Sequence, residues 1–112
     1  MKGTKTIEFD GDKITFRFTA GVIEDLQEYA EQNDVAPEDL DNKIKHQRVM
    51  LALMELYGED SDKAARDPKI IEKAVEKGLK YKTMDFDTIL GVLDSLGVEA
   101  EGKVKKAAEK KT

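Results

Sequence analysis

Polar and apolar residues alternate through residues 4 to 18, TKTIEFDGDKITFRF, on both sides of an Asp-Gly pair. Alternation of this kind places one face of each strand against a core, and Asp10-Gly11 suits a tight turn because both residues tolerate positive φ. The pattern predicts a β-hairpin. Its inward-facing residues are Ile7 and Phe9 on the first strand, and Ile14, Phe16 and Phe18 on the second. Because a lone hairpin is marginal in water, helices must cover this face.

Beyond the hairpin, apolar residues recur at the three- and four-residue spacing of helices that bury one face. The first helix is predicted from about Ala20 to Gln32, with Thr19 as its N-cap. A second helix is predicted to start between Ala36 and Asn42 and to run to Tyr57, with Gly58 as its stop. These two helices would form the first half of a helical body.

The rest of the body is predicted to contain a short, weakly specified helix at 63–66 and two longer ones. Asp67-Pro68 predicts the start of the next helix, because Asp caps and Pro suits the first turn. Its apolar stripe is Ile70, Ile71, Ala74, Val75 and Leu79. Thr83 is the predicted cap of the last helix, which Gly97 closes. The apolar positions of this last helix are Phe86, Ile89, Leu90, Leu93 and Leu96.

The run VMLALMELY, residues 49 to 57, has eight apolar residues out of nine, and Glu55 is the only interruption. A solvent-facing helix shows only an apolar stripe, so this helix is predicted to be central. Packing inside the bundle accounts for most of it. A chain this small cannot easily surround such a helix, however, so part of it is also predicted to meet a partner or another subunit, where flexible Met side chains adapt well. The candidate partner-binding residues are Met50, Leu53, Met54 and Tyr57.

The composition fits one small helical domain. A chain of 112 residues supports one modest core, and 38% charged with 6% aromatic residues favours helices over a β-sandwich. The fold prediction is a mainly α (α+β) domain over residues 1–97, with the hairpin at 4–18 and a bundle of about four helices over 20–97. Residues 98–112, VEAEGKVKKAAEKKT, have almost no large apolar groups and predict a flexible charged tail.

Charge and cysteine content argue against several classes of function. A formal net charge of −5 gives no basic field for nucleic acid, so no nucleic-acid partner is expected. The absence of Cys excludes disulfides, a thiol nucleophile and thiolate metal sites. No segment approaches the roughly 20 apolar residues that span a bilayer, and no signal peptide is visible. The expectation is a cytoplasmic protein that does not bind membranes.

Candidate catalytic and metal-binding patterns are incomplete. His46 has no nucleophile or orienting carboxylate supplied by a motif, so an ordinary surface or partly buried histidine is predicted. In the loop GEDSDKAARD, residues 58–67, Asp60 and Asp62 have the spacing of a calcium loop, but the Gly at the sixth position and the bidentate Glu at the twelfth are missing. The carboxylate pairs at 24–25 and 85–87 fit helix caps or solvent faces. We expect no catalytic residues, no metal and no cofactor.

The opening TIEFDGDKITFRFTAGVIEDLQEYAEQ places a short hairpin turning on FDG directly before an amphipathic helix, and a helical body and charged end follow. This layout, over roughly residues 4 to 97, resembles the small tail assembly chaperones of long-tailed phages and prophages. The resemblance implies a helical protein of the host cell cytoplasm that self-associates, binds the tape measure protein, keeps it soluble and helps it recruit tail tube subunits. It carries no residue-level motif, so it implies a role without assigning sites.

The sequence therefore predicts a non-enzymatic tail assembly chaperone for a tape measure protein. The alternative is a small helical regulatory or adaptor domain, associated with nucleic acid through its Lys-rich tail. A third reading, an acid/base enzyme that uses carboxylates, would need a deep pocket lined by at least two of them.

Overall fold

The computed structural model describes residues 3–40 and 43–97, and it confirms an N-terminal hairpin followed by a helical body. The predicted tail at 98–112 lies outside the described residues. In chain order the elements are β1 (Thr4–Phe9), β2 (Asp12–Arg17), α1 (Ala20–Gln32), the 3₁₀ turn η1 (Pro37–Asp39), α2 (Ile44–Glu59), α3 (Ser61–Ala65), α4 (Ile70–Gly78), the 3₁₀ turn η2 (Leu79–Thr83) and α5 (Phe86–Ser95).

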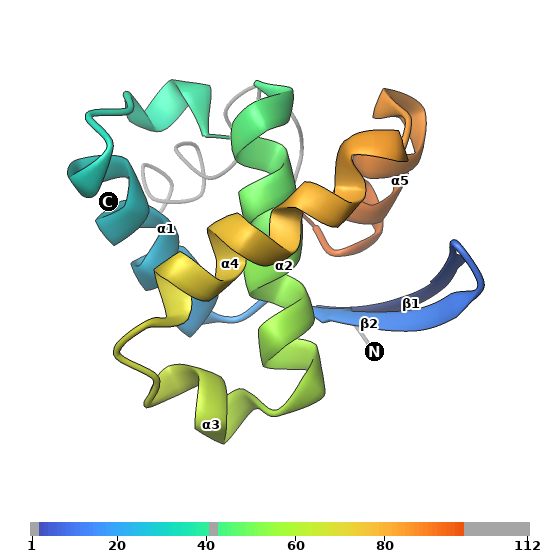
Figure 1. Ribbon diagram of the computed structural model, residues 1–112, viewed down its shortest axis with the longest axis horizontal. Helices are drawn as coiled ribbons and strands as arrows, with labels where there is room; N and C mark the ends of the chain where they lie inside the picture. The colour runs from blue at the N-terminus through green and yellow to red at the C-terminus, as the bar shows by residue number, and fades with distance from the viewer. Residues whose placement is uncertain (1–2, 41–42, 98–112) are drawn as a thin grey trace.

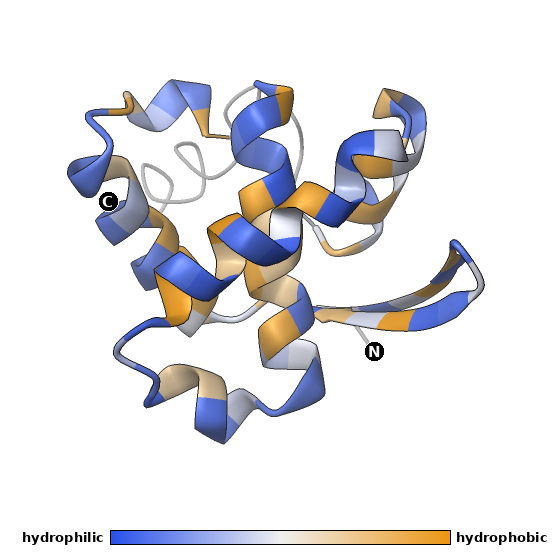
Figure 2. Ribbon diagram, in the orientation of Figure 1, coloured by the Kyte–Doolittle hydropathy of each residue, from blue (hydrophilic) through white to orange (hydrophobic). Residues whose placement is uncertain are grey.

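Helix α2 lies at the centre of the molecule, as its apolar sequence predicted (Figure 1). It contacts β2, α1, α3, α4 and η2, while α5 contacts β1. Figure 1 shows α4 crossing in front of α2, and Figure 2 shows hydrophobic positions of both helices at this crossing. One cluster of buried apolar side chains extends from Ile14 in the hairpin to Leu96 after α5. The hairpin and the helices therefore share one core.

The hairpin forms as predicted, with β1 and β2 antiparallel and Ile7 opposite Ile14. Asp10 and Gly11 both have positive φ, at 54° and 86°, which is the backbone conformation that the tight turn requires. Phe16 is fully buried and Ile14 nearly so, and both belong to the shared core. The two-stranded sheet is thus stabilised by packing on the helical body, as expected for a hairpin of this size.

The first helix also has the predicted bounds. Thr19 is its N-cap, and the Thr19 hydroxyl accepts a hydrogen bond from the Val22 N–H at 3.4 Å. The residues that α1 buries recur at helical spacing: Val22, Leu26, Tyr29 and Ala30. Capping and periodicity agree here, which is why the sequence predicted both ends of this helix.

The predicted start and stop of the second helix were both wrong. The segment Pro37–Asp39 forms a separate 3₁₀ turn, Leu40 after it is buried, and Lys43 is extended before α2 begins at Ile44. At the other end the helix continues through Gly58 to Glu59. Gly58 is a contact residue, because a Cβ atom there would lie 2.0 Å from the carbonyl oxygen of Thr15 in β2. Its missing side chain lets the hairpin backbone approach the central helix.

The later helix starts also differ from prediction. Helix α4 begins at Ile70, and the Asp67 carboxylate accepts a hydrogen bond from the Lys69 N–H at 2.8 Å in the turn before it. Asp85, not Thr83, caps α5, with its carboxylate 2.7 Å from the Thr88 N–H. The weakly specified helix at 63–66 exists as α3 over Ser61–Ala65. For α5, Thr83 and Asp85 are both residue types that can cap, and the structure uses the later one.

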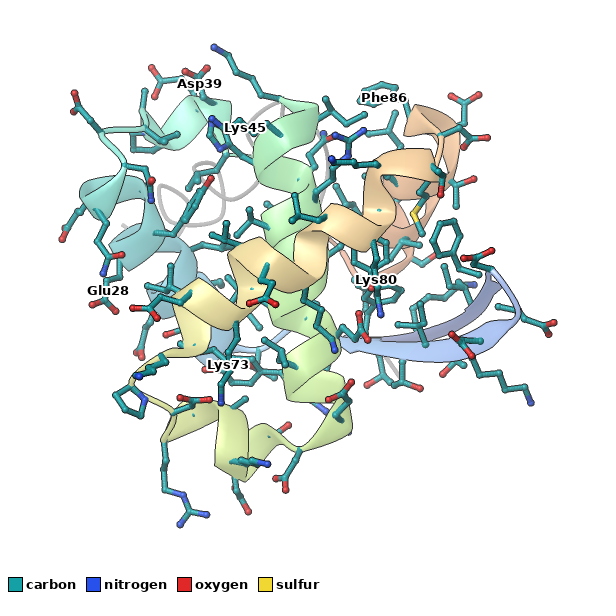
Figure 3. The ribbon with its side chains drawn as sticks, viewed as in Figure 1. Glu28, Asp39, Lys45, Lys73, Lys80 and Phe86 are labelled. Carbon is teal, nitrogen blue, oxygen red and sulfur yellow. The ribbon has the colours of Figure 1, made fainter. Side chains whose placement is uncertain are left out.

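Glu55, the one charged residue in the apolar run, is buried in a polar cluster between α2 and η2. Its carboxylate accepts hydrogen bonds from the Tyr81 hydroxyl and from Lys80 Nζ, the latter at 2.7 Å, and Lys77 Nζ lies 3.5 Å away. Figure 3 shows Lys80 beside this part of α2. Burial of a carboxylate is costly unless it is paired and hydrogen-bonded. Glu55 thus ties the segment after α4 to the central helix.

We predict that Gly58→Ala lowers the free energy of unfolding by about 2 kcal/mol or more, because the new methyl group would overlap backbone atoms that cannot move separately from the hairpin. The control is Gly91→Ala in α5, where an added Cβ meets nothing within 4 Å. That variant should be neutral or about 0.5–1 kcal/mol more stable. Urea unfolding measures both, and equal stabilities for the two variants would contradict the close contact.

We also predict that Tyr81→Phe lowers the free energy of unfolding by about 1–3 kcal/mol, because Glu55 would keep a buried oxygen without its hydroxyl donor. Lys80→Gln, at a side chain that is 40% exposed, should cost less than about 1 kcal/mol. Thermal and urea unfolding of both variants measure this difference. A Tyr81→Phe variant as stable as the parent would show that the buried hydrogen bond contributes nothing.

Candidate partner-binding groove

An apolar groove of about 140 Å³ lies where the first half of α2 meets the end of α4 and the start of η2. We call it the α2–α4 groove. The described residues that line it are Tyr29, Lys45, Arg48, Val49, Val75, Gly78, Leu79 and Lys82. Its volume is below the roughly 300–1,000 Å³ of small-molecule pockets, so it suits one large side chain of a partner better than a cofactor.

The groove exists because α4 approaches α2 closely at its last residue. A Cβ atom on Gly78 would lie 3.0 Å from the carbonyl oxygen of Arg48. Next to this approach, Val75 and Leu79 remain 44% and 57% exposed. The sequence analysis placed both residues in the buried stripe of their helix, and that prediction was wrong. They lie beside the α2–α4 crossing, where no described element covers them.

Cationic side chains accompany this apolar lining. Lys45 and Arg48 come from α2, and Lys82 comes from η2. Arg48 Nη2 donates to the Lys82 carbonyl oxygen at 3.3 Å, which holds the guanidinium at the groove, and the Arg48 Nε is buried without a hydrogen-bond partner. No acidic side chain is among the described residues that line the groove. In a chain with a formal net charge of −5, the groove is a local cationic site.

A buried hydrogen bond between α1 and α2 holds Tyr29, one of the residues that line the groove. The Tyr29 hydroxyl and His46 Nδ1 lie 2.9 Å apart, and the two rings meet edge to face. Burial, together with the neighbouring Lys45 ammonium, lowers the pKa of His46 below its ordinary value. The imidazole ring is therefore neutral at neutral pH. The sequence predicted an ordinary surface or partly buried histidine, whereas the structure buries His46, which is 9% exposed, in a structural role. His46 of α2 thus holds α1 next to the groove through Tyr29.

The four candidate partner-binding residues lie in the core and do not form an exposed surface. Met50, Leu53 and Met54 are 0% exposed and Tyr57 is 4% exposed. The Tyr57 hydroxyl donates to the Asp25 carboxylate at 2.7 Å, which joins α2 to α1. Contact between a partner and these side chains stays a prediction, and it would require the core to open. In this fold they hold in place the helices whose outer surfaces form the groove.

Several acidic side chains in and near the segments considered for chemistry make structural contacts. Asp60 caps α3 through a 3.1 Å hydrogen bond from the Lys63 N–H. Asp67 pairs with Lys73, and this hydrogen bond lowers the pKa of its carboxyl. Burial raises the pKa of Asp25 although the Tyr57 hydroxyl partly offsets it. Carboxylates also line two surface hollows, one formed by residues 56–73 and one between α1 and residues 65–72. Among the described residues, however, no group of acidic or His side chains is arranged to hold a metal ion.

The sequence analysis missed the α2–α4 groove because each of its parts has an ordinary explanation. Lys45 and Arg48 are ordinary charged residues of a helix, and Val75 and Leu79 were predicted as part of the apolar stripe of theirs. One signal was available. The stripe predicted for α4 is wide, and the segment leading into the next helix, LKYKT, is rich in Lys. A wide apolar stripe followed by cations can mark an amphipathic binding surface.

Comparisons of the chain with models of protein families, with curated proteins and with solved structures find no match. Within residues 3–40 and 43–97, no helix is long and apolar enough to cross a membrane.

Acidification should destabilise the fold through His46. Because its folded-state pKa is lower than its ordinary value of 6.5, the unfolded chain takes up the proton first as the pH falls. We predict that the free energy of unfolding decreases between about pH 7.5 and about pH 5.5. His46→Gln should flatten this dependence, and His46 is the only histidine in the chain. Urea unfolding at both pH values tests it, and equal slopes for parent and variant would contradict the assignment.

Proposed function

We propose that this chain is a non-enzymatic tail assembly chaperone that binds a phage tape measure protein, keeps it soluble and assists assembly of the tail tube. The observation that carries the proposal is an exposed apolar groove bordered by cations on a well-packed helical body. Binding surfaces of this kind recognise amphipathic helices by their apolar face and by the charges beside it. The layout of the chain, a hairpin followed directly by an amphipathic helix, supports the same family of roles.

The proposed mechanism places a client helix along the α2–α4 groove. Val75 and Leu79 would contact an apolar side chain of the client. This contact would shield the client side chain from other client molecules and so prevent aggregation. Lys45, Arg48 and Lys82 would meet carboxylates that flank it. The core residues Met50, Leu53 and Met54 act indirectly, because they fix the helices that form the groove.

The groove also favours binding over catalysis. Its lining contains no carboxylate, Ser or Cys among the described residues, and the Tyr29 hydroxyl is engaged with His46 in a buried hydrogen bond between α1 and α2. The buried Glu55 is committed to Tyr81 and Lys80, and it does not line the groove. The alternative role, a regulatory domain associated with nucleic acid, depends on the Lys-rich segment at 98–112, which lies outside the described residues.

Removing the apolar lining should abolish the chaperone effect. We predict that the double variant Val75→Ser, Leu79→Ser lowers the soluble yield of a co-expressed tape measure protein to the level without chaperone. The client would be the tape measure protein encoded in the same genome. Val75 and Leu79 are about half exposed, so burying the rest of each contributes on the order of 1 kcal/mol, and losing both contacts removes much of the affinity of a small site. Centrifugation of lysates and quantification of the soluble client measure the effect.

Ile44→Ser is the matched control, because Ile44 is also an exposed aliphatic residue, at 37%, but does not line the groove. It should solubilise the client as the parent does. Met54→Asp is unsuitable for this purpose, since Met54 is fully buried and the charge would unfold the core. A client that stays soluble with the double variant, or stays insoluble with the parent chain, would refute the proposed function.

A further inference from the structure

Phe86 is the one exposed aromatic residue among the large hydrophobic side chains that the structure describes as exposed. It is the first residue of α5, and 46% of it is accessible. Asp85 and Asp87 flank it, and both are exposed. The hydrogen bond that Asp85 makes to Thr88 lowers the pKa of its carboxyl, so this group is ionised at neutral pH. The chain therefore displays a phenyl ring between two acidic residues.

The α2–α4 groove has the complementary pattern. Its apolar lining is accompanied by Lys45, Arg48 and Lys82, and no acidic side chain is among its described residues. Its volume of about 140 Å³ is similar to that of an apolar cavity known to accept benzene, about 150 Å³. The Arg48 side chain is part of the groove lining, and a carboxylate is the acceptor that a guanidinium favours.

We propose that the Asp85-Phe86-Asp87 segment of one copy of this chain docks in the α2–α4 groove of a second copy. The phenyl ring of Phe86 enters between Val75 and Leu79, and the flanking carboxylates meet the groove cations. In Figure 3, Phe86 and Lys45 lie along the same edge of the molecule. Docking in both directions closes a two-fold dimer, whereas docking in one direction extends a chain of copies.

The sequence disfavours the chain's own C-terminal segment as the occupant. Residues 98–112 contain five Lys and three Glu, so their formal charge of +2 has the same sign as the groove cations. They also contain no aromatic residue and no apolar residue larger than Val. The segment at 85–87 has the opposite charge and an exposed ring. This inference stands on the groove and on Phe86, and it does not depend on the chaperone role.

The first test is sedimentation equilibrium of the full chain over a wide concentration range. The parent chain should self-associate. Phe86→Ser and Leu79→Ser should each weaken association at least tenfold, since each removes one side of an apolar contact that is buried only in the complex. Ile44→Ser should associate as the parent does, because Ile44 is exposed but belongs to neither side. Circular dichroism establishes that every variant is folded.

Mixing the two weakened variants distinguishes a groove contact from two unrelated losses. Phe86→Ser keeps an intact groove and Leu79→Ser keeps an intact Phe86, so a 1:1 mixture should regain one contact and associate more strongly than either variant alone. The parent contains no cysteine, which makes a direct measurement possible. A mixture of Phe86→Cys and Leu79→Cys chains should form a disulfide between the two variants faster than Phe86→Cys with Ile44→Cys.

A parent chain that stays monomeric at all concentrations overturns the proposal. So does association that Phe86→Ser leaves unchanged, or a mixture that fails to regain a contact. Phe86→Ser should still solubilise a tape measure client, because its groove is intact. Loss of self-association with client binding preserved would therefore uphold the docking contact independently of the chaperone function. Association that persists in this variant would refute the docking contact whether or not a client binds.

Discussion

The backbone of α2 at Gly58 touches the backbone of β2 at Thr15, and the rest of the structure depends on approaches of this closeness to the central helix. A helix that is apolar on nearly every side must be covered on nearly every side, and few elements are present to do so. The hairpin covers one side because Gly58 has no side chain, and α4 covers another because Gly78 has none. Glu55 then fixes η2 through Tyr81 and Lys80. Backbone contact and one buried carboxylate thus replace the additional helices that a larger domain would use.

The parts of the fold that could be predicted from the sequence are those set by local patterns. Strand alternation with Asp10-Gly11 predicted the hairpin, and Thr19 with helical spacing predicted α1. The central position of α2 followed from its apolar run. The sequence did not reveal the role of Gly58, because a glycine near the end of a helix signals a stop equally well. Only the position of the hairpin, a contact between distant residues, makes Gly58 a close-approach site.

The binding groove was beyond the sequence for a related reason. Helical periodicity shows which residues can share a face, but not how much of that face the neighbours cover. In α4, Ile70, Ile71 and Ala74 reach the core, whereas Val75 lines the α2–α4 groove and remains exposed. Met50, Leu53 and Met54 show the converse case, because the sequence indicated their apolar character but not that the chain itself buries them completely. Which side chains of α4 become buried depends on how α4 crosses α2, and no local sequence pattern specifies that crossing.

The two proposed occupants of the α2–α4 groove cannot be present together, because its volume of about 140 Å³ accepts one large side chain. A second copy in the groove would lower the apparent affinity for a client in proportion to the fraction of grooves filled. The formal net charge of −5 opposes this filling at long range, so self-docking should be weak when the chain is dilute. A client with a locally acidic, apolar segment meets the same groove without the full repulsion between two copies of this chain. Weak self-docking would then cover Val75 and Leu79 in the absence of a client, and a client would displace the second copy from the groove.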